Sequence, residues 1–504
     1  MADRSLMLII IAGYLATCLG IGAWASRRTR SASDFFVAGR GIGTLLVGFA
    51  AFSTTMSGFG FIGGPGLVYK FGTSSFWICC PSVIGFSISA ILVAKRFKVF
   101  SSLFEIYTLP DAIANRYQSE LCRFLAALVI LLGVIAYLGT NILAFGTVAS
   151  TFFQIDFTLA AAGGMTVVIL YAVFGGIIAG LYTDVVQGII MVFASVTLFV
   201  IAMTTAGAGS FLAGPGNLTT TFREAGLGAA VGRWGVLGPM ACLGFLFLFA
   251  MGGSGQPHVI TKYLMLRDYK PVRWSLLVCS LAYILCILLW MSVGFAMKYL
   301  VITGQADPLP AGQEDNAAPL FLLEHAPAWL AGIGFSGLFA AIMSTADSFL
   351  NIGAGVFVRD IPQVFWKRTV SRELLWARTA TVVLAVSATG FALWAKQHGD
   401  LIAILGTFGW GLFAAAFVPA VAIGFNWKRA TWQGASSAIA VGQIANVGLD
   451  LLAKYPKDAP IYKIPGAVSI GAVALLSSLL TFILVSFLTP PQRLNPKTKL
   501  ALEV

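Results

Sequence analysis

The chain has 504 residues, of which 58% are hydrophobic and only 10% charged, and its mean hydropathy is +0.88. A soluble domain needs more charge to solvate its surface, so this composition excludes an ordinary soluble protein and predicts lipid as the main solvent. The net charge of +12 does not indicate nucleic-acid binding, because the basic residues lie in short loops between apolar stretches.

Thirteen apolar stretches are long enough to cross a bilayer, whose hydrocarbon of about 30 Å needs roughly 20 helical residues. In chain order they are Ser5–Ser26, Gly41–Tyr69, Phe76–Ala94, Phe124–Val148, Phe157–Gly175, Thr183–Ala206, Gly235–Thr261, Trp274–Met297, Trp329–Val358, Leu374–Ala395, Leu401–Phe425, Trp432–Leu452 and Pro465–Leu488. The first lacks a small-residue cleavage site and is expected to be a retained helix. We therefore predict an all-α membrane protein, with residues 1–504 forming a single transmembrane domain.

Basic residues predict the orientation, because cytoplasmic loops carry an excess of Lys and Arg. An outside N-terminus puts most of the 32 basic residues on the cytoplasmic side. Those residues are Arg27, Arg28, Arg30, Arg40, Lys95, Arg96, Lys98, Arg116, Arg123, Lys262, Arg267, Lys270, Arg273, Arg359, Lys367, Arg368, Arg372, Arg378, Lys428, Arg429, Arg493, Lys497 and Lys499. The prediction is a multi-pass protein of the plasma (inner) membrane, with its N-terminus outside and its C-terminus in the cytoplasm.

The second and seventh spans contain interruptions that a plain anchor helix would avoid. The second contains STTMSGFG over residues 53–60 and GGPG over 63–66, and the seventh contains GGSGQPH over 252–258. Glycine and proline weaken the helix, and the freed backbone groups find no partners in lipid, so such backbone lines an enclosed cavity. Paired interruptions in corresponding halves indicate a binding site near the membrane midplane. The alternative is that the glycines merely allow close helix packing.

The offset of five spans between these breaks predicts an inverted repeat of five plus five spans. The first repeat covers residues 41–206 and the second covers 235–425. Residues 5–26 form an extra N-terminal span, and residues 432–488 form two C-terminal spans.

The ninth span contains the sharpest group of polar residues. Ala341, Ser344 and Thr345 have the spacing i, i+3, i+4, so their oxygens share one helix face. Two hydroxyls and a carbonyl there, with carbonyls freed near Ser53 and Met56, would form a cage of five oxygens. Such a cage suits a hard monovalent cation such as sodium. The alternative is that both hydroxyls bond only to their own helix backbone.

Asp347 and Asp184 lie within or at the edge of apolar spans, where a carboxylate costs at least ~2.5 kcal/mol unless it is paired or hydrated. We expect both to take part in ion binding or coupling, and the alternative is a structural hydrogen bond. The three histidines are scattered and the seven cysteines form no metal motif. No metal other than sodium is therefore expected.

Several motifs together resemble the sodium:solute symporter family. They are DFFVAGR over residues 34–40, GGIIAGLYTDVVQ over 175–187, GQPH over 255–258 and STADS over 344–348. The resemblance covers nearly the whole chain and implies a thirteen-helix form of the leucine-transporter-like fold with a five-plus-five inverted repeat.

The resemblance also implies two sets of sodium ligands. The main set would be carbonyls of Ser53, Met56 and Ala341 with hydroxyls of Ser344 and Thr345. Some family members hold a second sodium, and its ligands would match Asp184, Ser344, Asp347 and Ser348. Whether this chain uses the second set is open.

The solute is less well defined by the sequence. The family's proline carriers have an acidic residue where this chain has Thr55, and a Trp and a Tyr where it has Phe249 and Gly253. Residues 61–72 look more like pantothenate carriers. Because amides at broken helices suit a carboxylate, we expect a small carboxylate or amino acid that is proline-, pantothenate- or monocarboxylate-like. The predicted solute contacts are Thr55, Ser57, Tyr137, Phe249, Gly253, Gln256 and Pro257.

These observations predict a sodium-coupled symporter that imports its solute by alternating access. Sodium is a co-transported ion, no organic cofactor or nucleic acid is expected, and the oligomeric state is open. Proton coupling through Asp347 and a sugar-type sodium symporter are alternatives with the same fold. A channel or a membrane sensor would be a different class. An enzyme is not expected, because no nucleophile–base pair or metal set is present.

Overall fold

The computed structural model describes residues 4–38, 41–268, 272–368, 370–397, 402–454 and 469–503. Within these ranges the regular elements are helices, and the one strand-like feature is an isolated bridge between Ile42 and Leu266. Arg40, Lys270 and the predicted span starts at Leu401 and Pro465 lie outside the described residues.

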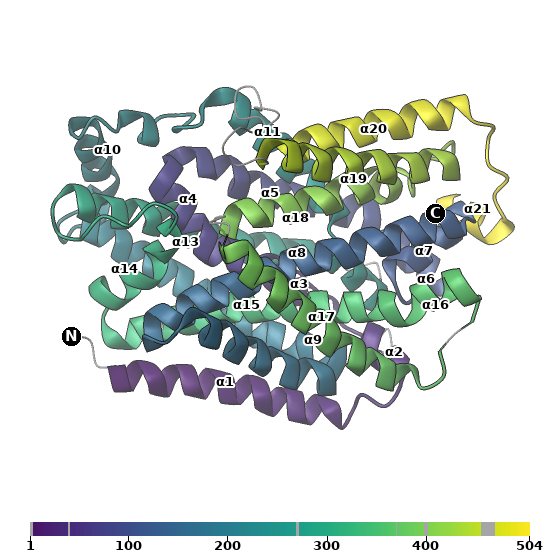
Figure 1. Ribbon diagram of the computed structural model, residues 1–504, viewed down its shortest axis with the longest axis horizontal. Coiled ribbons are helices and arrows are strands. Elements are labelled where there is room, and N and C mark those ends of the chain that lie inside the picture. Colours follow the sequence, from purple (N-terminus) through teal and green to yellow (C-terminus); the bar gives the residue numbers. More distant parts are fainter. Residues whose placement is uncertain are drawn as a thin grey trace.

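The long helices run roughly alongside one another, as Figure 1 shows. The elements of the first half are α1 Arg4–Ser26, α2 Ala32–Val37, α3 Thr44–Thr55, α4 Gly64–Phe71, α5 Phe76–Ser89, α6 Lys95–Leu103, α7 Leu109–Tyr117, α8 Glu120–Phe153 and α9 Phe157–Ala206. Those of the second half are α10 Gly214–Glu224, α11 Gly238–Gly252, α12 Pro257–Ile260, α13 Val272–Ile302, α14 Ala317–His325, α15 Ala328–Gly355, α16 Ile361–Trp366, α17 Glu373–Gln397, α18 Ile402–Phe417, α19 Trp432–Lys454, α20 Ile470–Leu488 and α21 Pro496–Glu503.

Eleven helices among the described residues are long and apolar enough to span a membrane. The number is below the predicted thirteen because residues 59–103 and 157–206 each form one nearly continuous helical stretch. Each of these stretches includes parts of two predicted spans. The all-helical membrane architecture is thus confirmed, and the count of thirteen crossings stays a prediction.

Helix α9 is two helices joined at a kink. Its 50 residues would extend about 75 Å as a straight helix, more than twice the hydrocarbon thickness of a bilayer. Gly176 interrupts it with φ 55° and ψ −153°, a conformation that is open essentially to glycine alone. A Cβ at Gly176 would also lie 2.6 Å from the ring of Phe35. The kink therefore lies directly after Gly175, where the predicted fifth span ends.

The predicted break in the second span is also confirmed. Helix α3 ends at Thr55, and Met56 has the non-helical angles φ −85° and ψ 89°. The chain then resumes as a π-helical turn, Phe59–Gly63, that leads into α4. The Gly58 N–H donates a hydrogen bond of 3.0 Å to Oδ1 of Asn141 on α8, so a side chain satisfies a backbone group that the break frees.

The seventh span breaks at the predicted place as well. Helix α11 ends at Gly252, and a 3₁₀ turn, Gly253–Gly255, leads to an extended Gln256 with φ −80° and ψ 115°. Pro257 then begins the single turn α12, where its missing N–H would have had no helical partner. Glycine also allows close packing here, because a Cβ at Gly253 would lie 2.6 Å from the Gly85 carbonyl carbon. These glycines therefore both interrupt the helix and allow close packing, which are the two roles that the sequence left open.

Helix α15 is the centre of the bundle. It is buried along almost its whole length, whereas α1 buries only one face. The inner face of α1 is joined to the centre by a hydrogen bond of 3.1 Å from Nε2 of Gln187 on α9 to the Tyr14 hydroxyl. The break of α3 and the first turns after the α11 break both pack on α15. The fold thus brings both interruptions to the most enclosed helix.

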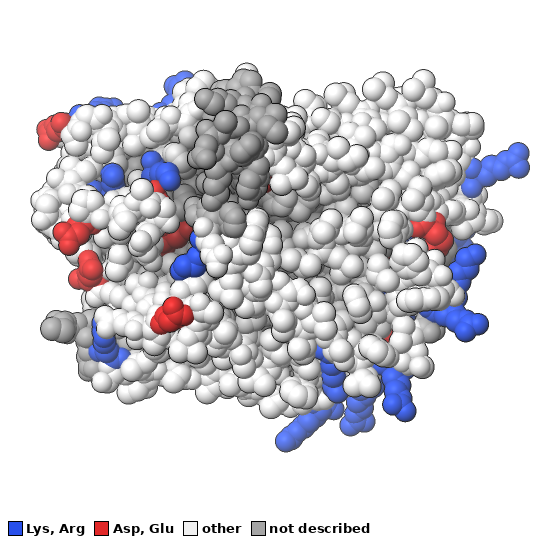
Figure 2. Space-filling view, viewed as in Figure 1, with Lys and Arg blue, Asp and Glu red and all other residues white. Residues whose placement is uncertain are grey.

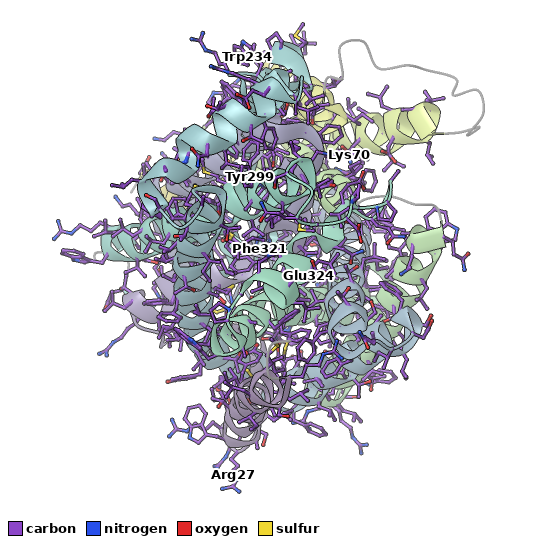
Figure 3. The ribbon with its side chains drawn as sticks, turned by 90° about the vertical axis from the view of Figure 1, so that its left-hand side faces the viewer. Arg27, Lys70, Trp234, Tyr299, Phe321 and Glu324 are labelled. Carbon is purple, nitrogen blue, oxygen red and sulfur yellow. The ribbon has the colours of Figure 1, made fainter. Side chains whose placement is uncertain are left out.

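The two ends of the bundle differ in charge. Figure 2 shows most of the visible Asp and Glu side chains at the end where α10 and α14 lie, and many Lys and Arg side chains at the end of α16 and α21. Figure 3 looks along the bundle from the α10 and α14 end, with Lys70, Tyr299 and Glu324 in view. Lys70 forms a 2.9 Å ion pair with Glu314 there.

The polar C-terminal segment folds back onto the bundle as α21. Nη1 of Arg96 on α6 donates a 3.0 Å hydrogen bond to the Ala501 carbonyl, and the Thr498 hydroxyl reaches the Asn115 carbonyl on α7 at 3.4 Å. Ala501 and Leu502 are buried. The segment therefore covers the junction between α6 and α7.

Candidate functional site

The polar face of α15 meets the broken end of α3. The Ser344 hydroxyl donates a hydrogen bond to the Ser53 carbonyl at 2.9 Å, and the Thr345 hydroxyl donates one to the Thr54 carbonyl at 3.0 Å. Both hydroxyls also lie near the Ala341 carbonyl, at 3.2 and 3.1 Å. All five residues are buried. Four of the five residues predicted for the main sodium site are thus in direct contact.

The end of α3 explains why its carbonyls are available to another helix. The last carbonyls of a helix have no N–H partner within it, so they need donors from elsewhere. Met56 completes the predicted set and is buried directly after the helix end. The Met56 N–H still closes the last turn of α3 by donating to the Phe52 carbonyl at 3.2 Å, but the Gly60 N–H donates to the Ser57 carbonyl at 2.9 Å, so the Met56 carbonyl is left outside the helical ladder. Sequence reasoning missed Thr54, because spacing alone does not show which freed carbonyl faces Thr345.

This arrangement of neutral oxygens has the chemistry of a site for a hard monovalent cation. Hydroxyl and carbonyl oxygens are the ligands that hard cations prefer, and neutral ligands suit a single positive charge. In the described part of the chain, no group of three or more His, Cys, Asp or Glu side chains could hold a metal ion.

The second predicted sodium set contains a lysine that sequence reasoning did not place there. Lys262 Nζ lies 3.1 Å from Oδ2 of Asp184 on α9 and donates a hydrogen bond of 3.2 Å to the Ser348 hydroxyl on α15. Lys262 is 1% exposed and Asp184 is fully buried. The expectation that Lys262 is a cytoplasmic loop residue was wrong, because the turn after the α11 break carries it into the bundle. Asp184 therefore has a structural hydrogen-bond partner, Lys262, which is the alternative to ion binding that the sequence left open.

Asp347 lies next to this ion pair but has a different environment. Its residue is 2% exposed, and its Oδ2 has no hydrogen-bond partner. Gly180 of α9 packs against that oxygen so closely that any Cβ there would clash with it. Asp347 follows Ser344 by three residues, so the two predicted sodium sets are continuous along one face of α15.

A group of stacked aromatic rings surrounds Phe249, one of the predicted solute contacts. Its ring stacks on Phe59 at a centroid distance of 6.0 Å and on Trp410 at 5.0 Å. Trp290 packs edge-on against Phe59 at 5.2 Å. Sequence reasoning missed Phe59, Trp290 and Trp410, because a tryptophan in an apolar span does not reveal whether it faces lipid or the protein interior.

Helix α18 brings Tyr137 close to this aromatic group. A Cβ at Gly409 would lie 3.0 Å from the Tyr137 ring, and the next residue, Trp410, stacks on Phe249. Tyr137 also lies beside Phe349 and His258, at ring distances of 4.8 and 6.2 Å, and beside Ser57. The structure therefore brings Ser57, Tyr137 and Phe249 together from three separate spans, and their role as solute contacts stays a prediction.

Several buried polar atoms in this region lack hydrogen-bond partners. They are the Ser57 hydroxyl oxygen, Oε1 of Gln256 and Nε1 of Trp410. Nε2 of Gln256 donates to the carbonyls of Gly252 and Trp410, which fixes its amide at the break. The Thr55 hydroxyl, in contrast, bonds to the Phe52 carbonyl of its own helix at 2.7 Å. Buried polar atoms without partners are rare in folded proteins, so these atoms are candidates to contact a ligand.

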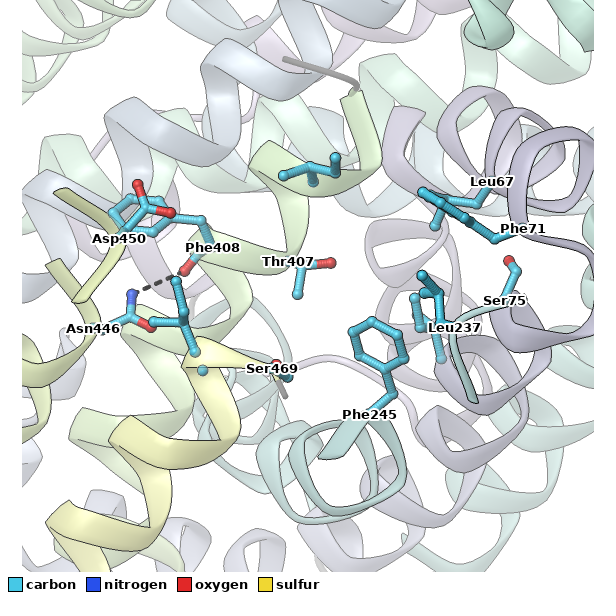
Figure 4. Close-up of a pocket in the computed structure, with 14 residues that line it drawn as sticks. Leu67, Phe71, Ser75, Leu237, Phe245, Thr407, Phe408, Asn446, Asp450 and Ser469 are labelled. Carbon is cyan, nitrogen blue, oxygen red and sulfur yellow. Dashed lines mark hydrogen bonds between the residues drawn. The ribbon is translucent and has the colours of Figure 1, made fainter. Parts of the chain in front are cut away.

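Two cavities lie near this centre but not within it. A cavity of about 260 Å³ is walled by Leu67, Phe71, Thr407 and other residues shown in Figure 4. A second, of about 430 Å³, is lined by residues that include Asp315 and Lys396. None of the seven predicted solute contacts lines either of these two cavities, and all seven are buried. The centre is thus closed in this conformation, with Thr407 one helical turn from Trp410.

These features define a class of membrane protein. Two interrupted helices meet a buried central helix, cation-type oxygens occupy one meeting point, and unpaired polar atoms with aromatic rings occupy the other. This is the construction of a secondary transporter, in which discontinuous helices form the ion and solute sites.

Comparison with known proteins identifies the family within that class. The sequence profile of the sodium:solute symporter family matches residues 35–442, so the chain belongs to this family of sodium-coupled transporters. It is 28% identical to the sodium/proline symporter of Escherichia coli K12 over 454 residues, which are 88% of each chain. It is 25% identical to the sodium/pantothenate symporter of the same organism over 443 residues, 87% of this chain and 89% of that one.

The fold is also shared with a solved structure. A Na⁺-coupled sialic acid symporter, solved in a substrate-bound outward-open state, superposes with a TM-score of 0.74 at 22% identity. The match covers 97% of this chain and 99% of the other. The likeness establishes that the two proteins share a fold.

Proposed function

We propose that this sodium-coupled symporter imports a small carboxylate or amino acid by alternating access. The proposal depends chiefly on one observation, the contact of the Ser344 and Thr345 hydroxyls with the carbonyls at the broken end of α3. Sodium at this point would coordinate Ser53, Met56, Ala341, Ser344 and Thr345, and would join α3 to α15. The ion would be a transported substrate, and no organic cofactor takes part.

Coupling follows from where the ion binds. An ion that bridges two helices favours the conformation in which both present their oxygens, and it shifts the equilibrium only by its difference in affinity for the two states. The break of α3 also contains Thr55 and Ser57, which are predicted solute contacts. Sodium binding would therefore order the segment that contacts the solute, and solute binding would then favour closure and inward opening.

The solute would bind among the unpaired polar atoms and the aromatic rings. Nε1 of Trp410 and the Ser57 hydroxyl can donate to a carboxylate, and Oε1 of Gln256 can accept from an ammonium or hydroxyl group. Phe249 with its stacked neighbours would hold the apolar part of the solute. The two relatives are named for proline and pantothenate, both of which are carboxylates. The proposed contacts are Thr55, Ser57, Tyr137, Phe249, Gly253, Gln256 and Pro257, with Trp410 added.

The topology proposed for this transporter has thirteen crossings, with residues 41–206 and 235–425 as inverted repeats. Its N-terminus lies outside and its C-terminus in the cytoplasm of the plasma (inner) membrane. One observation supports this orientation, namely the basic residues around α16 and α21. Accessibility labelling of single cysteines placed at Ser210 and Lys428 would test it, since only the former should react with an impermeant reagent from outside.

Uptake into proteoliposomes tests the function. Purified protein would be given radiolabelled proline, pantothenate, acetate, pyruvate, galactose or sialic acid, with and without an inward sodium gradient. We expect accumulation of one carboxylate or amino acid above equilibrium only with the sodium gradient. Accumulation of galactose alone would refute the proposed solute class. Accumulation driven only by a proton gradient would refute sodium coupling and direct attention to Asp347, whose Oδ2 has no partner.

A further inference from the structure

Lys262 lies among the residues that the family resemblance assigns to a second sodium ion. We propose that its ammonium group takes the place of that ion, so that each chain binds a single sodium. This inference rests on the proposed function, because it assumes the main sodium site between α3 and α15. It goes further by stating how many ions that transporter binds.

The backbone holds Lys262 firmly in this position. It lies in the 3₁₀ turn Thr261–Met265, directly after α12. The end of that turn is joined to the chain before α3, where the Ile42 N–H donates to the Met265 carbonyl at 3.1 Å and the Arg267 N–H to the Ile42 carbonyl at 3.0 Å. The ammonium group is therefore a built part of the site and not a loop side chain that reaches it by chance.

The ammonium group uses the same ligands that a second sodium would need. Lys262 Nζ contacts Asp184 Oδ2 at 3.1 Å and the Ser348 hydroxyl at 3.2 Å, and these are two of the four residues of the second set. A sodium ion held by the same two side chains would lie within a few ångströms of Nζ. Two like charges at that distance in a buried site repel strongly, so lysine and sodium exclude each other.

The charges in this part of the bundle also favour one sodium. Asp184 and Asp347 contribute two negative charges when both are ionised, and Lys262 contributes one positive charge. One sodium ion at Ser344 and Thr345, on the same face of α15 as Asp347, brings the sum of these charges to zero. A second sodium would leave an uncompensated positive charge in the protein interior, which is strongly unfavourable.

Counting bound ions tests this inference without knowledge of the solute. Equilibrium binding of ²²Na⁺ to the purified full-length protein would give the number of ions per chain. We expect one for the natural chain. We expect two for Lys262→Gln, with half-saturation requiring at least tenfold more sodium for the second ion. Lys262→Arg retains the charge and should again bind one, because a guanidinium group can pair with the same carboxylate.

Two further variants separate the outcomes. Lys70→Gln is the matched control, because it removes a lysine from an ion pair at the α10 and α14 end of the bundle. This variant should still bind one sodium ion per chain. Lys262→Gln combined with Thr345→Ala should lose the tighter ion and retain the weaker one. Two ions on the natural chain would overturn the inference, and so would a single ion on a folded Lys262→Gln variant. The natural-chain count is decisive even if that variant does not fold. No saturable sodium binding by any variant would instead refute the proposed function.

Discussion

Removal of the Thr345 hydroxyl is the most direct test of the main sodium site. The Thr345 side chain approaches the carbonyls of Thr54 and Ala341 at 3.0 and 3.1 Å, and it belongs only to the main predicted set. Thr345→Ala removes one of five proposed ligands without placing a larger group in the site. We therefore expect sodium affinity to fall while the fold is retained.

The size of the effect can be worked out from these contacts. An interaction between a hydroxyl and a charged group contributes about 1.5–3 kcal/mol. Since every 1.4 kcal/mol is a factor of ten in affinity, the sodium concentration for half-saturation should rise roughly 10- to 100-fold. The hydroxyl has a single proton, which it shares between two carbonyls, so the free energy of unfolding should fall by only about 1 kcal/mol.

The assay is ²²Na⁺ binding to purified protein, combined with solute uptake at a series of sodium concentrations. Thr345→Ser is the matched control, because it keeps the oxygen and loses only a methyl group. It should leave the sodium dependence within a few fold of the natural chain. Ser344→Ala should behave like Thr345→Ala. An unchanged half-saturating sodium concentration in both alanine variants, at normal protein abundance, would refute the assignment.

Three other predictions concern stability. Gly176→Ala should lower the unfolding free energy by about 1–3 kcal/mol, because the φ of 55° and ψ of −153° at this position suit only glycine. Gly163→Ala, on an open face of the same helix, is the control and should be nearly neutral in thermal unfolding. Arg123→Gln should cost about 3–5 kcal/mol, since it leaves the buried Asp360 and the mostly buried Asp111 without their arginine, yet it should not change ²²Na⁺ affinity in the folded fraction. Burial raises the pKa of Asp315 to about 7, and the nearby Glu314 charge adds to the effect, so the folded chain binds a proton that the unfolded chain releases near pH 4. The resulting stability is complete below pH 4 and lost as the pH rises to about 7, so melting temperatures measured between pH 5 and pH 8 should decline less in Asp315→Asn.

Much of the fold follows from the sequence because the lipid solvent leaves few choices. Apolar length predicts the spans, and the two glycine-rich interruptions lie where the structure breaks α3 and α11. The number of crossings is harder to predict, because residues 59–103 form one mainly apolar helical stretch. No long polar loop marks where one crossing ends and the next begins. Gly176 illustrates the same difficulty, since one backbone conformation divides an otherwise uninterrupted helix of 50 residues.

The sequence predicts those parts of the candidate site whose residues share one helix. The prediction is incomplete where the residues come from different segments. Ser344 and Thr345 share a face by spacing alone, and the structure places both against α3. Lys262 and Trp410 could not be assigned in this way, because their positions depend on how a turn and a separate helix pack against α9 and α11. Basic residues near the end of an apolar span usually indicate a loop, and Lys262 departs from that rule by pairing with a buried carboxylate.

The position of α21 has a consequence for the order in which the molecule can be completed. Residues 496–503 close over α6 and α7, which are made some four hundred residues earlier. During synthesis the junction between α6 and α7 therefore stays uncovered until α21 has been made and can fold onto it.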